Sequence, residues 1–304
     1  MSDGPAPFRA GYVSIAGRPN AGKSTLLNGL IGEKLAITAR QAQTTRTSIQ
    51  GVLTLPNAQI VFIDTPGIHK SDTLFNKRMM ATVRRALEDR DLVLYVVDSS
   101  KPIAVEERDA VSTLKRAKQT ILVLNKIDRL EDKRLLLPLI AQYLELYGFL
   151  EAIPVSARKG DGLDDLTQTI VKYLPEGAAV FPEECFTDQP MRFLAGEIIR
   201  EKILRDAQRE VPHAVAVVVD EWKETPALTR ICASIHVERP GQKKILIGKN
   251  GDMLKRIGAA ARTEIEAMIG NKVFLSLFVK VRRNWREDPA FLDEIDWRAM
   301  VGSE

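Results

Sequence analysis

A run of glycine, lysine and hydroxyl residues near the start of the chain has the composition of a polyphosphate site. It fits the pattern Gly-x-x-x-x-Gly-Lys-Ser/Thr and comprises Gly17, Arg18, Pro19, Asn20, Ala21, Gly22, Lys23, Ser24 and Thr25. The glycines leave room for backbone N–H groups to wrap an anion. Lys23 supplies a charge for the β and γ phosphates, and Ser24 supplies a hydroxyl ligand for Mg²⁺. The alternative, a glycine-rich turn before a helix, is disfavoured by the apolar, β-branched run before the pattern and the apolar helical face after it.

Two further motifs follow apolar runs that predict strands. The first comprises Asp64, Thr65, Pro66, Gly67 and Ile68; its carboxylate can hold Mg²⁺ through water, and the Gly67 N–H can contact a γ phosphate. The second comprises Asn125, Lys126, Ile127 and Asp128. Guanine offers N1–H and an exocyclic amine as paired donors to the Asp128 carboxylate, whereas adenine offers no such pair. We therefore expect GTP and GDP as ligands, with Asn125 directed at the N7 and O6 edge and the Lys126 stem over the ring.

Two shorter segments complete the predicted site. Ser156 and Ala157 follow the last apolar run of the first half, where a backbone N–H can contact guanine O6. The polar segment 39–46 lies where a switch loop would close over Mg²⁺ and the γ phosphate. Thr45 is the favoured metal ligand because it directly precedes a predicted strand, and Thr44 is the competing choice that the sequence does not settle. The predicted metal ligands are Ser24, Thr45 and, through water, Asp64.

The residue after Gly67 bears on catalysis. Ras-like enzymes carry a glutamine there to orient the attacking water, whereas this chain has Ile68. An isoleucine side chain cannot hydrogen-bond to water, so slow intrinsic hydrolysis is expected unless another group substitutes. A potassium ion held near Asn20 would supply positive charge at the phosphates. The predicted catalytic residues are Lys23, Thr45 and Asn20.

Alternating apolar and amphipathic runs indicate how these motifs are positioned. Strands are predicted at 12–16, 46–53, 59–64, 92–98, 120–125 and 152–156, and helices at 24–31, 74–89, 105–117, 133–147 and 163–174. The turn at 55–58 is too short for a crossover helix, so the second and third strands are expected to pair antiparallel on an otherwise parallel sheet. The predicted fold is an α/β domain with a mixed six-stranded sheet, helices on both faces and the ligand site at the carboxyl ends of the strands.

The second half has a different pattern. A helix is predicted near 193–205 and strands at 214–219 and 231–237. After the second strand, a Gly-x-x-Gly loop opens a helix with Asp252 as N-cap, and a strand at 273–281 completes the order α-β-β-α-β. In that helix one apolar face comprises Leu254, Ile257, Ala261, Ile265 and Met268. KH modules use such a loop to clamp about four single-stranded nucleotides. The residues predicted to bind RNA are Gly248, Lys249, Asn250, Gly251, Lys255 and Arg256, with Arg262 extending the basic surface.

Charge, length and cysteine usage agree with this organisation. The 304-residue chain has a net charge of only +4, yet residues 239–286 contain 12 Lys/Arg against 3 Asp/Glu, a local charge of +9 that favours a polyanionic partner. Cys185 and Cys232 have no paired spacing, so neither a disulfide nor a zinc site is expected. No signal-like start or apolar run of ~18 residues occurs, which predicts a cytoplasmic protein. We expect two domains, 1–176 and 191–304, joined by a proline-containing linker at 177–190.

The first half resembles the TrmE-Era-Der-like GTPases in its motifs at 17–24, 43–46 and 64–68. Its single N-terminal P-loop argues against members with two GTPase domains or a late-inserted one. With the second half, including 181–182, 187–190 and 279–285, the resemblance is to the Era family and covers Arg9 to about Asp288. It implies a type II KH domain that binds the 3′ end of 16S rRNA, a role in assembling the 30S ribosomal subunit, and peripheral association with the inner face of the cell membrane. DNA is not an expected partner, and a monomer is expected.

Two alternative functions stay open at this point. A regulatory GTPase signalling to a membrane or protein partner would use the basic segment as an anionic-lipid patch, and its RNA binding would be indifferent to substitution of Gly248 and Gly251. A stand-alone RNA-binding module with a degenerate nucleotide site is disfavoured, because no phosphate-contacting or base-contacting position is missing. The acidic tail 288–297 is predicted to be a docking helix, with a helix for a partner protein as the alternative.

Overall fold

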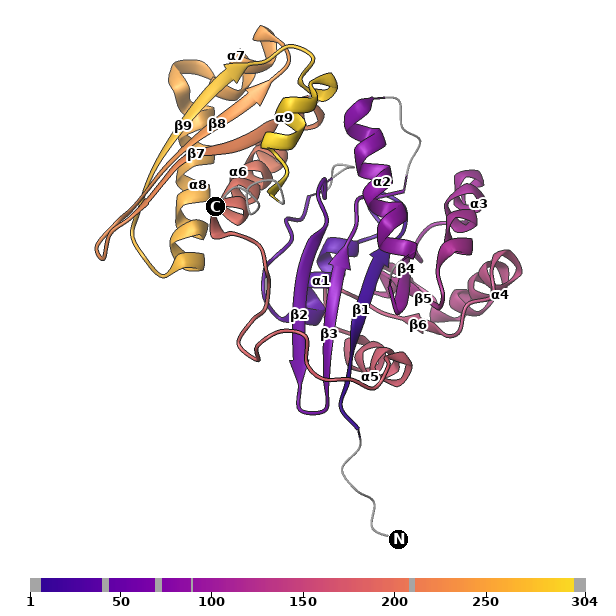
Figure 1. The fold of residues 1–304 in the computed structure, drawn as a ribbon. Coiled ribbons are helices and arrows are strands. Elements are labelled where there is room, and N and C mark those ends of the chain that lie inside the picture. Colours follow the sequence, from indigo (N-terminus) through magenta and orange to yellow (C-terminus); the bar gives the residue numbers. More distant parts are fainter. Residues whose placement is uncertain (1–6, 40–43, 69–72, 89, 208–210, 298–304) are drawn as a thin grey trace. The chain divides into compact units, whose positions relative to one another are not determined.

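A computed structural model describes residues 7–39, 44–68, 73–88, 90–207 and 211–297 (Figure 1). Contacts between Cα atoms divide the chain into two compact units. The first comprises the described parts of Met1–Ala36, Thr45–Ser71 and Lys77–Asp188, and the second those of Ile37–Thr44, Asp72–Asn76 and Gln189–Glu304. Two short segments from the first half of the sequence therefore belong with the second unit.

The first unit is built on a six-stranded sheet. Its strands are β1 (Arg9–Ala16), β2 (Ile49–Leu55), β3 (Ala58–Asp64), β4 (Leu92–Asp98), β5 (Thr120–Asn125) and β6 (Ala152–Pro154), in the order β2-β3-β1-β4-β5-β6. β2 and β3 pair antiparallel and every other pair is parallel. The predicted hairpin on a parallel sheet is therefore confirmed.

Helices cover both faces of this sheet, as predicted (Figure 1). They are α1 (Lys23–Ile31), α2 (Leu74–Glu88), α3 (Val105–Ser112), α4 (Leu136–Leu146) and α5 (Leu163–Tyr173). Alternate residues of β4 enter different cores: Leu94 packs in the cluster that includes α1 and α5, and Tyr95 in the cluster that includes α2, α3 and α4. This double burial explains why the strands are continuous apolar runs. The predicted helices at 105–117 and 133–147 are each partly 3₁₀, at Thr113–Arg116 and Lys133–Leu135.

The connector after α5 is ordered by docking along the β2–β3 edge, as its prolines and lack of periodicity predict. The buried Gln59 amide accepts from the N–H groups of Val180 (2.7 Å) and Phe181 (2.9 Å) and donates to the Phe181 carbonyl at 2.8 Å. The Val52 N–H donates to the Phe186 carbonyl at 2.9 Å. Because β2 is the edge strand on this side of the sheet, the bond from Val52 satisfies a backbone donor that would otherwise be exposed.

The second unit is a three-stranded sheet with helices. Its elements are α6 (Met191–Asp206), β7 (Ala216–Glu224), β8 (Thr229–Val237), α7 (Pro240–Ile247), α8 (Asp252–Ile269), β9 (Val273–Val281) and α9 (Pro289–Glu294). The strand order is β7-β8-β9, with β7 antiparallel and β9 parallel to β8. Ile257, Ala261 and Ile265 of α8 are buried in one core with α6 and the sheet, as the predicted apolar face requires.

Two predictions for this unit are wrong. The predicted order α-β-β-α-β lacks a helix. The segment before the Gly-x-x-Gly loop forms α7, because Pro240 occupies its first position and the buried Gln242 side chain accepts from the backbone N–H of Glu238 (3.0 Å) and of Arg239 (2.9 Å). The observed order is therefore α-β-β-α-α-β. Asp252 is not the N-cap of α8 but its first residue, because Gly251 takes the cap position with φ 80°.

The tail forms a docking helix within its own unit, as predicted. The Asp288 carboxylate caps α9 by accepting from the Phe291 N–H at 3.3 Å. Phe291, Leu292 and Trp297 are buried, and the Phe291 ring lies 4.8 Å from that of His236 on β8. Among the described residues, no helix combines the length and hydropathy needed to cross a membrane.

Candidate functional site

The phosphate loop connects β1 to α1. The Arg18 carbonyl accepts from the Lys23 ammonium at 3.2 Å, and the Gly17 carbonyl accepts from the Ile68 N–H at 3.1 Å. α1 begins at the buried Lys23, and its N-cap residue Gly22 makes no side-chain cap. The first-turn N–H groups and the positive end of the helix dipole therefore face the loop, which is the arrangement that binds phosphate.

Three oxygen-bearing side chains meet beside this loop. The Ser24 and Thr45 hydroxyls lie 2.8 Å apart, and they donate to Asp64 Oδ2 at 2.7 and 2.8 Å. Asp64 Oδ1 is buried and has no hydrogen-bond partner among the described residues. Hydroxyl and carboxylate oxygens are ligands that Mg²⁺ prefers, so these residues fit a magnesium ion. Of the two threonines left open by the sequence, Thr45 is the one whose hydroxyl lies in this cluster.

Lys23 and Asp64 are buried, and burial disfavours the charged form of each. Burial raises the pKa of Asp64, opposed by the charge of Lys23 and by hydrogen bonds from Ser24, Thr45 and Thr65. Burial likewise lowers the pKa of Lys23, opposed by the charge of Asp64. A polyphosphate beside Lys23 and a cation beside Asp64 would each favour the charged form of its neighbour.

The predicted base-recognition residues converge at the carboxyl ends of β5 and β6. The Ser156 hydroxyl donates to Asp128 Oδ1 at 2.8 Å, which fixes the carboxylate. The Lys126 ammonium donates to the Asn20 carbonyl (2.5 Å) and to Asp98 Oδ2 (2.7 Å). The lysine stem is thereby held between the phosphate loop and β4.

Asn125 has a bracing role that the sequence did not indicate. Its Nδ2 donates to the Ala21 carbonyl at 2.9 Å, and its Oδ1 accepts from the N–H groups of Lys126 (2.8 Å) and Ala157 (3.0 Å). We expected Asn125 and the Ala157 N–H to contact guanine; in the structure they contact each other. One amide therefore joins the phosphate loop to both base-recognition loops.

Asp98 was missed by sequence reasoning, although a signal exists. It ends β4 and lies in register with Asn125 at the end of β5. A carboxylate at the end of a central parallel strand lies at the edge where ligands bind. Hydrogen bonds and charge from Lys126, together with hydrogen bonds from Ser100, lower the pKa of Asp98 although its partial burial acts in the opposite direction.

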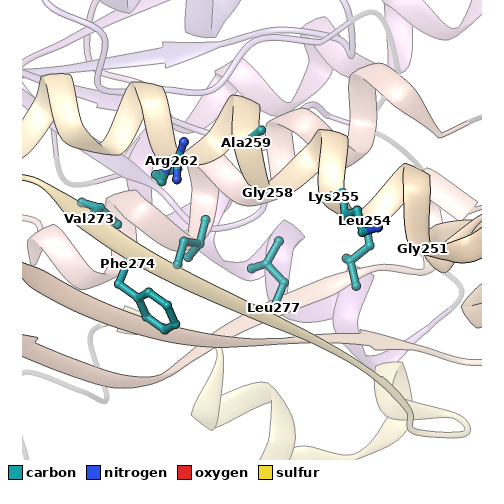
Figure 2. A pocket seen from close by; sticks show the side chains of 10 residues that line it. Gly251, Leu254, Lys255, Gly258, Ala259, Arg262, Val273, Phe274 and Leu277 are labelled. Atoms are coloured by element: carbon teal, nitrogen blue, oxygen red, sulfur yellow. The ribbon is translucent and has the colours of Figure 1, made fainter.

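A groove of about 490 Å³ lies between α8 and β9 in the second unit (Figure 2). It is lined by Gly251, Leu254, Lys255, Gly258, Ala259, Arg262, Val273, Phe274, Leu275 and Leu277. Of the residues predicted to bind RNA, Gly251 and Lys255 line the groove, and Gly248, Lys249 and Asn250 form the turn that precedes it. Arg256 does not line it: its Nε donates to Asp206 Oδ2 at 2.8 Å. The apolar β9 residues of the lining were not identified from the sequence.

Comparisons with known proteins agree with both sites. Residues 12–126 match the family described as "50S ribosome-binding GTPase", and residues 210–286 match "KH domain". GTPase Era of Geobacter metallireducens is 49% identical over 300 residues, covering 98% of this chain and 100% of the relative. GTPase Era of Syntrophus aciditrophicus is 47% identical over 293 residues, covering 95% of each.

Two solved structures are similar over nearly the whole chain. One is Era in complex with MgGDPNP and nucleotides 1506–1542 of 16S ribosomal RNA, with 40% identity and a TM-score of 0.93, covering 95% of this chain and 99% of the other. The second is a variant of Aquifex aeolicus Era bound to GDP and aluminium fluoride, with 40% identity, a TM-score of 0.92 and the same coverage. The sequence similarity over nearly the full length of the chain, together with the matches to the GTPase and KH families, shows that the chain belongs to the Era family of GTPases.

Proposed function

We propose that this protein is a GTP-hydrolysing switch that binds the 3′ end of 16S rRNA through its KH domain and assists assembly and maturation of the 30S ribosomal subunit. The observation that carries the proposal is the presence in one chain of the Asp128–Ser156 guanine site and of a basic groove behind Gly248 and Gly251. The similar Era structure with 16S rRNA nucleotides supports the choice of RNA.

The residues of the nucleotide site divide the work of hydrolysis. Lys23 and the phosphate-loop N–H groups bind the β and γ phosphates, and Asp128 selects guanine. Ser24, Thr45 and Asp64 would hold Mg²⁺, which when bound neutralises charge on those phosphates. The Ile68 side chain is buried and apolar, and its N–H is already donated to Gly17. No group at this position can orient water, so slow intrinsic turnover follows.

A potassium ion near Asn20 is the proposed substitute for the missing polar group. Asn20 is exposed, has φ 65°, and has its carbonyl held by Lys126, which leaves the side-chain amide oxygen available to a cation at the phosphates. Turnover should be faster in K⁺ than in Na⁺ at equal ionic strength, while the GDP affinity stays the same. Equal turnover in the two salts would contradict the potassium site.

The RNA assignment is tested by two matched substitutions at opposite ends of α8. Gly251 and Gly270 both have positive φ, 80° and 67°, and an added Cβ meets no atom closer than 3.9 Å at Gly251 and none within 4 Å at Gly270. Gly251→Asp places a negative charge at the groove, and we expect it to weaken binding of an RNA matching the 3′ end of 16S rRNA at least tenfold. Gly270→Asp introduces the same residue and the same backbone cost away from the groove and should have little effect. Equal affinities for all three proteins, or a loss of GTP affinity in Gly251→Asp, would contradict the proposal.

Location and assembly state are the remaining parts of the proposal. We place the protein in the cytoplasm as a monomer, with peripheral association at the inner face of the cell membrane supported by the local charge of +9 at 239–286. Flotation with vesicles containing anionic lipid, compared with neutral vesicles, tests the membrane contact. Sedimentation velocity of the full chain tests the monomer.

A further inference from the structure

The sheet of the second unit has two faces with different coverage. α6 and α8 bury one face, to which Leu275, Leu277 and Val279 of β9 contribute. Side chains alternate along a strand, so Phe274 and Phe278 lie on the opposite, outer face. Figure 2 shows the Phe274 ring directed away from α8, whereas Leu277 points toward it.

The outer face is only partly covered. α9 covers the end near His236 through Phe291. Beyond this end, Phe274 is 46% exposed and Phe278 is 55% exposed. In the part of the chain that the structure describes, these two exposed phenylalanines form an apolar surface on one strand face.

Cations accompany both rings. Arg230 of β8 lies in register with Phe274, and its guanidinium carbon is 4.8 Å from the ring centroid. Lys280 lies two residues beyond Phe278 on the same strand face, exposed and 4.0 Å from Asp220. On β7, at the far edge of the sheet, the Asp220 side chain reaches to 4.0 Å from Lys280 and Glu221 pairs with Lys223. The two rings and Arg230 lie on β8 and β9. A polyanion would therefore follow β9 rather than β7.

We infer that Phe274, Phe278, Arg230 and Lys280 form a stacking platform for RNA bases, which continues the groove onto the outer face of the sheet. Exposed aromatic rings and arginine planes are the surfaces on which unpaired bases stack. Phe274 lines the groove and also lies beneath Arg230, so a strand that leaves the groove across the free edge of β9 meets it first. The two Phe positions are about 13 Å apart along the strand, which is too far for one base to contact both rings.

This platform rests on the proposed function, because its RNA is the strand that occupies the groove. The nearby positive charge favours RNA over a second copy of this chain, which would bring like charges together. A stable protein interface also needs about 800 Å² from each partner, far more than two rings supply.

The test uses the full chain and two RNAs. The short RNA has four nucleotides and fills only the groove; the long RNA matches the 3′ end of 16S rRNA. Phe278 does not line the groove, so Phe278→Ala should weaken the long RNA on the order of tenfold and leave the short RNA unchanged. Phe278→Trp, which keeps a stacking ring, should retain affinity for the long RNA. The matched control is Phe186→Ala, which removes a 43% exposed phenylalanine from the connector and should change neither affinity.

A spectroscopic readout separates stacking from general apolar contact. 2-Aminopurine placed at successive positions of the long RNA should be quenched at a base outside the groove, and Phe278→Leu should abolish that quenching. No change in the long-RNA affinity of Phe278→Ala, while Gly251→Asp weakens both RNAs, would overturn the platform and leave the proposed function standing. If Gly251→Asp weakens neither RNA, the proposed function itself fails.

Two other outcomes would also overturn the platform. An equal loss of affinity for the short and long RNAs in Phe278→Ala would make the ring a support of the groove only. A wild-type dimer that Phe278→Ala dissociates in sedimentation velocity, with unchanged affinity for the long RNA, would make the face an interface between copies of the chain.

Discussion

The specificity of single residues in the nucleotide site depends on neighbours that hold them. Asp128 keeps a fixed orientation because Ser156 donates to its Oδ1. Lys126 has a backbone φ of 68° and keeps its ammonium between Asn20 and Asp98. Asp98 and Ser156 need no contact with the base to act, since they position Lys126 and Asp128, the residues predicted to contact it.

Asp128→Asn should change the preferred base. The oxygen of an Asn side chain can still accept from guanine N1–H, but its nitrogen cannot accept from the exocyclic amine and can instead donate to the extra carbonyl of xanthine. We expect GTP affinity to fall at least a hundredfold, because one charge-assisted hydrogen bond becomes neutral and the other is replaced by two opposed donors, and XTP affinity to rise. Competition between labelled GDP and unlabelled GTP or XTP measures both changes. A parallel loss of affinity for both nucleotides would show that Asp128 supports the loop and does not select the base.

His236 should make the second unit sensitive to acid. Burial, together with the charges of Lys280 and Arg282 and opposed by Asp220, lowers the pKa of His236 to about 4 from 6.5. As the pH falls, His236 is protonated in the unfolded chain before it is protonated in the folded chain. The stabilisation of the fold by neutral His236 is therefore fully present above pH 6.5 and is lost as the pH falls toward 4. The loss should be about 3 kcal/mol.

Urea unfolding at pH 7 and pH 4.5, with wild type and His236→Gln, isolates this contribution. Carboxylates titrate in both proteins, whereas only the wild type carries the histidine. The difference in unfolding free energy between the two proteins should therefore shift with pH in favour of His236→Gln under acid. A difference that does not change with pH would show that His236 is not the acid-sensitive group.

Residue types at fixed spacings were enough to predict that GTP and GDP are the ligands, because the side chains of each motif suit phosphate, Mg²⁺ or guanine. The Ser24, Thr45 and Asp64 oxygens are within 2.8 Å of one another although 40 residues separate the first and last. The bracing bonds of Asn125 could not be predicted, since they depend on where three loops meet in space. The pairing of Arg256 with Asp206 likewise depends on how α8 packs on α6.

At the scale of elements, the Gly-x-x-Gly turn shows how two glycines of one motif differ. An ideal Cβ on Gly248 would lie 2.8 Å from the Met253 Cβ and 2.9 Å from its backbone nitrogen, whereas on Gly251 the nearest atom is 3.9 Å away. Both residues have positive φ, 75° and 80°. Gly248 is therefore required for space and conformation, and Gly251 for conformation alone.

Alanine at these positions should separate the two requirements. Gly251→Ala should lower the unfolding free energy by about 1 kcal/mol, which is the cost of a left-handed alanine. Gly248→Ala should cost on the order of 3 kcal/mol, because the backbone of α8 must also move. Chemical denaturation of the full chain, followed by the fluorescence of Trp285 and the other tryptophans, measures both. Equal losses would show that the turn yields without disturbing Met253.

Long periodic elements were predicted from the sequence with accurate ends: β4, β5 and β9 begin and end as expected. The short helix α7 was not predicted, because the apolar run Ile245–Ile247 is too short to show a helical period. The signals that decide for a helix are Pro240 and the Gln242 cap, which lie five and three residues before that run.

At the scale of the whole molecule, the boundary between the two compact units falls within the predicted switch segment 39–46, between Thr44 and Thr45. The described residues of Ile37–Thr44 belong with the second unit, while Thr45 belongs with the first and its hydroxyl lies beside the Ser24 hydroxyl and the Asp64 carboxylate in the predicted metal site. No periodicity marks this division in the sequence, and the predicted boundaries at 176 and 190 stay predictions. The residue before Thr45 belongs to the second unit. A change in the ligand that Thr45 contacts is therefore expected to affect the second unit through the backbone that joins them.

RNA should therefore bind more tightly to the form with a non-hydrolysable GTP analogue than to the GDP form, by a factor between about 5 and 150. By linkage, RNA must strengthen binding of the analogue relative to GDP by the same factor. Fluorescence anisotropy of labelled RNA in each nucleotide state, and of labelled nucleotide with and without RNA, gives the two ratios. Equal RNA affinity in both states would contradict the switch.

The amide of Asn125 has a consequence for how the site opens. The backbone hydrogens of Lys126 and Ala157 are both donated to its single Oδ1 atom. Neither hydrogen can stay protected from exchange with solvent once that side chain rotates, so the two amides should share one opening free energy, seen as equal protection factors in deuterium exchange. The two amides lie 31 residues apart in the sequence. The loops after β5 and β6 therefore form one unit of local unfolding, which the Asn125 side chain holds closed.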